Sequence, residues 1–387
     1  MLKLGIIGFG GRLTGIVNKL VNTGKVQVCA VMDIDNERVR EKVEKLRENK
    51  PEIQEMYSDI HYYDDAEEML KNEKLDGVCI GTRCSTHTEY ALLVAKYRVP
   101  FFLEKPVGIC EEELEKLKGI LDFSDKIVVS FPLRMTRMVT YVKELLDADK
   151  IGKVVHVQAY NNVPYGRGYY HKWYRDESIT GGLFLQKATH DFDYINYLIG
   201  DDKPIRVCAM KSKQVFKGDK PAGLRCADCK ETATCPESPQ NVAKNNDGYI
   251  IGEWCCFAED VGNEDSGSAL IEYESGMHVA FSQDFIVRNS AGKRGARLIG
   301  FKGTIEFDWY DEKVIVYKHQ ENLVETHKFS NMQSDHFGGD LALVNNFVGV
   351  MEGSEKSCAT LKEGILSANM CLMCKRSSEE KKFFDIV

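Results

Sequence analysis

The first chemically suggestive feature is a glycine-rich turn, Gly8-Phe9-Gly10-Gly11-Arg12-Leu13, between an apolar run and a helical pattern. In a turn that binds a dinucleotide, Gly8 would allow the tight bend and Gly10 would let the backbone approach a pyrophosphate. The phosphate would sit at the helix N-terminus, where unpaired N–H groups and the helix dipole favour an anion. Leu13 occupies the position of the usual third glycine, so we expect Gly15 to relieve the packing of the helix on the strand.

An acid at the end of the next apolar run strengthens this interpretation. Asp33 lies 23 residues after Gly10, about the distance at which a carboxylate can hold the ribose hydroxyls of a dinucleotide. An acid there disfavours a 2′-phosphate, so we predict NAD as the cofactor, with NADP kept as an alternative because Arg38 is near. A second interpretation is that Asp33 and Asp35 only cap the charged helix that follows.

Three closely spaced cysteines, Cys226, Cys229 and Cys235, stand in a polar segment at about residues 216–246 that has the composition of an inserted loop. Thiolates at this spacing can converge on one tetrahedral ion, and Cys255 is the best candidate for the fourth ligand. Because four cysteines leave no open position on the metal, the predicted ion is a structural zinc. The alternatives are thiols without a metal, a disulfide between two of them, or an iron–sulfur cluster.

Composition narrows the class of protein. The 387 residues include 59 acidic and 51 basic side chains, a net charge of −8, which argues against nucleic acid or an anionic membrane as the main partner. No apolar run approaches the roughly 18 residues of a membrane-spanning helix. The N-terminus lacks the successive regions of a signal peptide, so we expect a cytoplasmic protein whose thirteen cysteines are mostly reduced.

The elements that must position these residues follow two patterns, of which the first covers residues 1–131. There, short apolar runs alternate with helical patterns, which predicts right-handed crossovers and a parallel sheet. The predicted fold is α/β, an N-terminal Rossmann doubly wound sheet that binds NAD(P). Its expected strands are Lys3–Gly8, Val26–Met32, Gly77–Gly81, Phe101–Leu103 and Ile127–Ser130, and its expected helices include Asn36–Glu48, Asp64–Lys71, Thr86–Tyr97 and Glu111–Phe123.

Over residues 132–387 the pattern changes to alternating strands. Their periodicity predicts a C-terminal α+β domain around a large, mainly antiparallel open sheet with one covered face. We expect this domain to bind substrate, to form oligomers and to contain the insert at 216–246, and we expect the C-terminal helices to pack back on the first domain. The expected strands are Lys153–Tyr160, Ala269–Tyr273, Met277–Gln283, Arg297–Ile299, Thr304–Phe307 and Lys313–Tyr317, and the expected helices are Thr189–Leu198, Asp340–Met351 and Leu361–Lys375.

Three further motifs, in order along the chain, are similar to those of the glucose–fructose oxidoreductase and inositol dehydrogenase family (Gfo/Idh/MocA). They are Gly81-Thr82 with His87 and Ala91, then Glu104-Lys105-Pro106, and then Gly181-Gly182-Leu183 through His190-Asp191-Phe192-Asp193. A late segment, residues 300–306, resembles the family's sheet motif, so the resemblance spans nearly the whole chain.

The resemblance implies an NAD(P)-dependent oxidoreductase that acts on a secondary hydroxyl of a sugar, polyol or glycoside. It implies that Lys105, at a strand's carboxyl end, orients the reacting hydroxyl, and that His190 takes its proton near neutral pH. We also expect a cis peptide bond before Pro106. The further cofactor-binding positions that it implies are Gly81, Thr82, His87, Glu104 and Lys105.

The sequence departs from the family pattern beside His190. The acid four residues before it is replaced by Gln186, an amide that can hydrogen-bond a substrate but cannot accept a proton. Lys187 would add a second positive group, and Asp191 or Asp193 could orient His190, as a third group orients a catalytic base. The candidate catalytic residues are therefore Lys105, His190, Lys187, Gln186 and Asp191.

Two loops are further candidates for the site. The aromatic and amide-rich stretch from Tyr160 to Tyr174 suits either a bound carbohydrate or a subunit contact. Residues 336–340 precede a late helix, and we expect them to return to the rim of the site.

Two other functions stay open at this point. One is a redox-assisted glycosidase or lyase that retains its NAD, and the other is a non-catalytic nucleotide-binding regulator. The presence of both Lys105 and His190 argues against the regulator. As partners we expect a small-molecule sugar or polyol and a second copy of the chain, in a dimer or tetramer formed through the open sheet.

Overall fold

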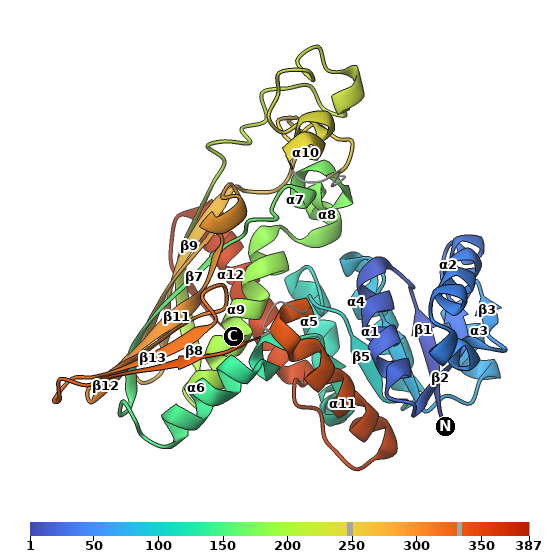
Figure 1. The fold of residues 1–387 in the computed structure, drawn as a ribbon, viewed down its shortest axis with the longest axis horizontal. Helices are drawn as coiled ribbons and strands as arrows, with labels where there is room; N and C mark the ends of the chain where they lie inside the picture. The colour runs from blue at the N-terminus through green and yellow to red at the C-terminus, as the bar shows by residue number, and fades with distance from the viewer. Residues whose placement is uncertain (246–250, 331–334, 387) are drawn as a thin grey trace. The chain divides into compact units, whose positions relative to one another are not determined.

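The computed structural model describes residues 1–245, 251–330 and 335–386. The chain divides into two compact units, Met1–Arg137 with Gln333–Asn369 and Met138–Met332 with Met370–Val387 (Figure 1). The first unit thus includes a late helix, α11 (Gly339–Glu352), besides the N-terminal residues. Among the helices of the described residues, none is both long and apolar enough to cross a membrane.

The first unit is built on a six-stranded, wholly parallel sheet in the order β3-β2-β1-β4-β5-β6. In dinucleotide-binding folds of this order, ligands bind at the carboxyl ends of the strands where the order reverses, between β1 and β4. That edge carries the residues that follow β1, β2, β4 and β5. The strands are β1 (Leu2–Ile7), β2 (Val26–Met32), β3 (His61–Tyr63), β4 (Gly77–Ile80), β5 (Phe101–Leu103) and β6 (Ile127–Val129).

Helices cover this sheet because their apolar residues repeat at helical spacing. In α1, Leu13, Ile16, Val17, Leu20 and Val21 are all buried. The late helix α11 packs on the same sheet, with the rings of Phe102 and Phe347 5.9 Å apart between centroids. The helices of this unit are α1 (Gly11–Asn22), α2 (Asn36–Asn49), α3 (Ala66–Asn72), α4 (His87–Lys96), α5 (Glu111–Lys118) and α11, and α12 (Leu361–Glu380) begins in it.

The predicted elements of this part agree with the structure apart from two details. The helix expected over Glu111–Phe123 ends at Lys118, where Gly119 follows, and a 3-10 turn over Leu121–Lys126 replaces its last residues. The sequence did not predict β3 (His61–Tyr63), because its residues are only partly buried and form no apolar run, unlike the equally short β5 and β6.

The second unit holds a nine-stranded sheet in the order β14-β13-β12-β11-β7-β10-β9-β8-β15. It is antiparallel as predicted except between β7 and β10, which pair in parallel. The sequence reading missed β8, β14 and β15. The strands are β7 (Val154–Asn162), β8 (Pro204–Ser212), β9 (Ser266–Tyr273), β10 (His278–Asp284), β11 (Lys293–Gly300), β12 (Gly303–Asp308), β13 (Lys313–Lys318), β14 (Val324–Lys328) and β15 (Phe384–Asp385).

The helices of this unit include one that lies along a face of the sheet, α9 (Thr189–Ile199), directly after a π-helical turn over Phe184–Ala188 (Figure 1). Its aromatic side chains meet those of the strands edge to face: Tyr194 packs on Trp309 at 5.1 Å, and Phe192 packs on Phe281 at 5.1 Å. The other helices are α6 (Arg137–Asp147), α7 (Gly168–His171), α8 (Glu177–Thr180) and α10 (Pro239–Asn245).

A buried ion pair also fixes α9 to the sheet. Asp191 is fully buried, and its two carboxylate oxygens accept two hydrogen bonds of 2.8 Å from Arg294 of β11. Asn161, which pairs with Arg294 across β7 and β11, donates a third bond of 3.0 Å to the same carboxylate. Burial works against the Arg294 charge, but Asp191 outweighs it and raises the pKa of Arg294.

We predict that Arg294→Met strongly destabilises the protein, because it leaves the Asp191 carboxylate buried without its counter-charge. Removing one partner of a buried ion pair typically costs about 3–5 kcal/mol, and we expect a loss of this order in the free energy of urea unfolding. Arg297→Met is the matched control, since Arg297 lies on the same strand but is exposed and pairs with Glu306 at 3.1 Å. It should change stability by less than about 1 kcal/mol; equal losses in the two variants would contradict the prediction.

Candidate active site

The glycine-rich turn after β1 has the backbone geometry of a phosphate-binding turn. Gly8 has φ +80°, and a Cβ there would lie 2.6–2.9 Å from atoms of Thr82, so only glycine fits. Gly10 caps α1 without a side-chain hydrogen bond, and a Cβ there would contact only the Gly81 carbonyl, at 3.6 Å. The N–H groups at the start of α1 are therefore not capped by the Gly10 position and can face an anion.

The missing third glycine is compensated at Gly81 and not at Gly15. A Cβ on Gly81 would lie 2.8 Å from the Cβ of Leu13, so the absence of a side chain on β4's end makes room for Leu13. A Cβ on Gly15 would meet nothing within 4 Å. The expectation that Gly15 relieves this packing is wrong, because the close contact lies on the facing strand end.

Asp33 joins the turn after β1 to the turn after β2. Its carboxylate accepts a hydrogen bond of 2.7 Å from the backbone N–H of Phe9 and one of 3.1 Å from that of Asp35. Arg38 donates to the same carboxylate at 3.2 and 3.3 Å. The alternative role as a helix cap falls to Asp35, which accepts the Arg38 N–H at the start of α2. Asp33 therefore remains the acid at the end of β2.

A charged network holds Arg12, just after the turn. Arg12 donates two hydrogen bonds of 2.7 Å to Asp340 and lies 3.2 Å from Glu104. Despite the burial of Asp340, Arg12 and His336 hold the pKa of its carboxyl well below the usual range. Residues 336–340 were expected to return to the rim of the site, and Asp340 does contact the turn's own arginine within the first unit.

The Glu104-Lys105-Pro106 motif follows β5 at the same sheet edge. The Lys105–Pro106 peptide is cis, as expected. His87 is buried, and its Nδ1–H donates 2.7 Å to the Pro106 carbonyl. Burial lowers the pKa of His87, so its ring is neutral near pH 7. His87 therefore supports the turn that carries Lys105.

In the second unit, the segment before α9 carries Gln186 and Lys187 on a π-helical turn, a form that is frequent at functional sites. Gln186 is buried, and its amide donates 2.9 Å to the Thr180 carbonyl. Lys187 is also buried; its ammonium donates 2.8 Å to the Tyr165 hydroxyl and lies over the rings of Tyr165 and Tyr169. Burial, followed by repulsion from Arg294, lowers the pKa of Lys187 to about 7.

His190 lies in the first turn of α9 and is buried, with 4% of its surface exposed. The next residue, Asp191, has both carboxylate oxygens bound by Arg294 and Asn161. Asp191 therefore fixes the helix to the sheet. Asp193, two residues further along the chain, is also buried.

Several residues near the glycine turn or near Lys187 were not predicted from the sequence. Arg294 was left outside the predicted strand, although it stands at an inward position of β11. Lys42, whose ammonium donates a hydrogen bond of 2.6 Å to the Phe9 carbonyl, was not singled out within its charged helix. Tyr165 lay in the aromatic stretch that suits either a bound carbohydrate or a subunit contact. These side chains are recognised only by their contacts with residues far away in the sequence, which no local pattern shows.

The cysteine insert does not support the predicted zinc. Backbone pairing of Arg225 with Trp254 sets Cys226 beside the segment of Cys255. Burial, and then the neighbouring thiols of Cys255, Cys235 and Cys229, raise the pKa of Cys226 to about 11. Across residues 1–245, 251–330 and 335–386, no group of three or more His, Cys, Asp or Glu side chains could hold a metal ion. Cys226, Cys229, Cys235 and Cys255 form no disulfide in this part of the chain, and burial also raises the pKa of the Cys255 thiol.

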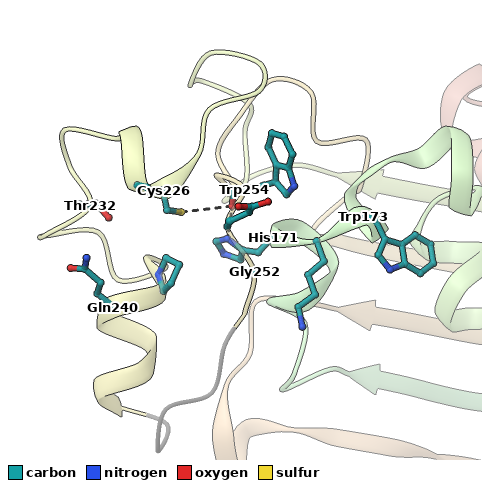
Figure 2. Close-up of a pocket in the computed structure, with 11 residues that line it drawn as sticks. His171, Trp173, Cys226, Thr232, Gln240, Gly252 and Trp254 are labelled. Carbon is teal, nitrogen blue, oxygen red and sulfur yellow. Dashed lines mark hydrogen bonds between the residues drawn. The ribbon is translucent and has the colours of Figure 1, made fainter. Parts of the chain in front are cut away.

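A cavity of about 630 Å³ lies beside these cysteines in the second unit. Figure 2 shows Thr232 and Gln240 on one side of it and His171, Gly252 and Trp254 on the other, with Cys226 between them. The Cys226 thiol points toward the Trp254 carbonyl, 3.8 Å away (Figure 2). The lining of this cavity includes none of the candidate catalytic residues.

Comparison with known proteins identifies the family. Residues 2–131 match the model of the oxidoreductase family's NAD-binding Rossmann fold, and residues 143–386 match that of its C-terminal alpha/beta domain. The protein YteT of Bacillus subtilis (strain 168) is 26% identical over 324 residues, which cover 73% of this chain and 74% of YteT. The myo-inositol 2-dehydrogenase of Thermotoga maritima is 26% identical over 204 residues, 52% of this chain and 56% of that enzyme.

A solved structure shows the same fold. Levoglucosan dehydrogenase in complex with NADH superposes with a TM-score of 0.76 over 100% of this chain and 99% of that one, at 15% identity. The two family models together cover almost the whole sequence. The parallel sheet, the glycine turn and the lysine after β5 agree with them. The chain therefore belongs to the Gfo/Idh/MocA oxidoreductase family, with the NAD-binding domain first and the C-terminal α/β domain second.

Proposed function

We propose that the protein oxidises a secondary hydroxyl of a sugar, polyol or glycoside with NAD. The observation that carries this proposal is the position of Lys105, directly after β5 at the sheet edge that bears the Gly8 turn. A cation there can stabilise the alkoxide that develops as an alcohol is oxidised. The inositol and levoglucosan dehydrogenases among the similar proteins support a hydroxylated ring as substrate.

The residues at this edge fit the cofactor. Gly8, Phe9, Gly10 and Gly11 would receive the pyrophosphate at the start of α1, and Asp33 would receive the ribose hydroxyls. When bound, the nicotinamide supplies a hydride acceptor. Gly81, Thr82, Glu104 and Lys105 follow β4 and β5, where the nicotinamide half of such a cofactor would lie.

The proposed chemistry divides between four side chains. Lys105 orients the reacting hydroxyl, and His190, held in α9 by the Asp191 anchor, takes its proton. Gln186 and Lys187 complete the second unit's contribution, Gln186 as a positioning amide and Lys187 as a second basic group. The experiment that tests this proposal supplies myo-inositol, levoglucosan and methyl glucosides as substrates with NAD or NADP. The reaction is monitored through the absorbance of the nicotinamide. Release of the aglycone without net reduction of added NAD would favour the glycosidase alternative.

We further infer a homo-oligomer formed through the open face of the large sheet. Met210 of β8 and Leu270 of β9 lie on this face, with 73% and 54% of their surfaces exposed. Exposed apolar side chains on a sheet face are typical of protein interfaces.

We predict that Leu270→Glu lowers the oligomeric state, because it places a charge in the proposed contact. Size-exclusion chromatography with light scattering should show dimers or tetramers for the unmodified protein and a smaller species for the variant. Glu272→Gln, on the same strand face, is the control. A monomeric unmodified protein would contradict this interface.

We predict that Lys105→Met and His190→Ala each lower kcat by roughly 10²–10⁴-fold, the usual contribution of general acid–base participation. NAD affinity, measured by calorimetric titration, should stay near normal. Gln186→Ala should cost less, since an amide can only position the substrate. Full activity of His190→Ala on a confirmed substrate would show that His190 is not the base.

We predict that the protein binds NAD more tightly than NADP and that Asp33→Ala narrows this preference. The substitution removes hydrogen bonds to the ribose and releases Arg38 for a 2′-phosphate. A hydrogen bond to a charged group contributes about 1.5–3 kcal/mol, so NAD should bind roughly tenfold or more weakly. Asp65→Ala, which removes the carboxylate that caps α3, should leave both affinities unchanged in the same titrations. Tighter binding of NADP by the unmodified protein would contradict the assignment.

A further inference from the structure

Lys187 is held in a manner that suits a proton carrier. It is buried, with 6% of its surface exposed, and in the described residues a phenol and two ring faces hold its ammonium. The Nζ atom donates 2.8 Å to the Tyr165 hydroxyl and lies 4.4 Å and 4.8 Å from the ring centroids of Tyr165 and Tyr169. This arrangement positions an amine without neutralising it with an acid.

The charged and titratable groups around Lys187 come from α9, from β11 and from the segments after β7 and β12. Arg294 of β11 repels the ammonium and Asp191 of α9 attracts it, but these two are already paired with each other. Tyr165 comes from the loop after β7 and Tyr169 from α7. Tyr310, after β12, interacts with Tyr165 and Arg294. Burial dominates this balance, so the pKa of Lys187 falls to about 7. A lysine with such a pKa can take up and release a proton near neutral pH.

The neighbouring position cannot do the same. Gln186 stands where the family pattern has an acid, and its amide is tied to the Thr180 carbonyl at 2.9 Å. An amide neither accepts nor gives up a proton at neutral pH. Lys187, on the π-helical turn, and His190, in the first turn of α9, are three residues apart on one continuous helical segment.

Tyr165 connects the buried amine to solvent. Half of its surface, 50%, is exposed, although its hydroxyl binds the buried Lys187. A phenol hydroxyl both accepts and donates hydrogen bonds, so it can take a proton from an ammonium while giving its own to water.

We propose that Lys187 and Tyr165 carry to solvent the proton that His190 removes from the substrate hydroxyl, an inference that rests on the proposed function. The hydroxyl O–H bond breaks as an N–H bond forms on His190, and the electron pair of the C–H bond leaves as hydride to the cofactor. The imidazolium of His190 then gives its proton to the neutral amine of Lys187. Lys187 passes a proton to the Tyr165 oxygen as the Tyr165 hydroxyl proton goes to water, which restores all three groups.

The test separates proton transfer from charge. Lys187→Arg keeps a cation but stays protonated at any working pH. We expect Lys187→Arg and Lys187→Met each to lower kcat by ~10²-fold or more at pH 7, and Tyr165→Phe, which keeps the ring face, to lower it less. The rise of kcat with pH near 7 should disappear in both Lys187 variants. Added methylamine should restore part of the activity of Lys187→Ala. Lys213→Met, which removes a half-buried lysine bonded to the Val261 carbonyl, should leave the pH profile unchanged.

A second measurement does not depend on turnover. In protein labelled with ¹³C-lysine, the Lys187 Cε resonance, assigned by its loss in Lys187→Met, should titrate near pH 7 and shift its midpoint in Tyr165→Phe. A midpoint near the ordinary lysine value would overturn the relay, and so would wild-type activity in Lys187→Arg on a sugar that the unmodified protein oxidises. Failure of the unmodified protein to reduce NAD with any sugar of the panel would instead remove the proposed function, and the relay with it.

Discussion

The buried pair of Asp191 and Arg294 is the constraint on which the second unit's chemistry depends. A carboxylate and a guanidinium inside a protein are costly to desolvate, and only good geometry and further hydrogen bonds repay that cost. Here the two hydrogen bonds of 2.8 Å and the third from Asn161 supply both. The pair joins α9 to β11 at a fixed rotation of the helix. That rotation sets where Lys187 and His190 stand, and the Arg294 charge also helps to keep Lys187 poised between its two protonation states.

The first unit depends instead on close backbone approach. At the strand ends, Gly8 meets Thr82 and Gly81 meets Leu13, with no space for a Cβ on either glycine. This contact holds the turn after β1 against the end of β4, and Asp33 ties the same turn to the end of β2 through the Phe9 N–H. The charged contacts of Arg12 with Glu104 and Asp340 then connect the turn to the end of β5 and to α11. The main role of each of these residues is to hold the backbone in position, and a role in ligand binding comes second.

The sequence allowed most of the fold to be predicted, because long helices and buried strands carry their periods in a few adjacent residues. Thr189–Leu198 and Phe101–Leu103 are examples. The misses have physical causes: β3 is only partly buried, β15 is two residues long, and the partners of Asp191 lie 30 and 103 positions away. Glycine positions could be recognised by type, but which one relieves Leu13 depends on the facing strand. The spacing of Cys226, Cys229 and Cys235 suggested a metal, but no group of three or more His, Cys, Asp or Glu side chains among the described residues could hold one.

The π-helical turn over Phe184–Ala188 has a consequence for how this family can change in evolution. A π turn contains one residue more than an α-helical turn, and each residue of an α-helix turns the chain by about 100°. Deleting a single residue before Lys187 could therefore convert the turn to α-helix without disturbing α9 or its hold on the sheet. The deletion would rotate Gln186 and its predecessors around the helix axis relative to His190. The loss of one codon would thus change which side chain of this turn lies on the same side of the helix as His190.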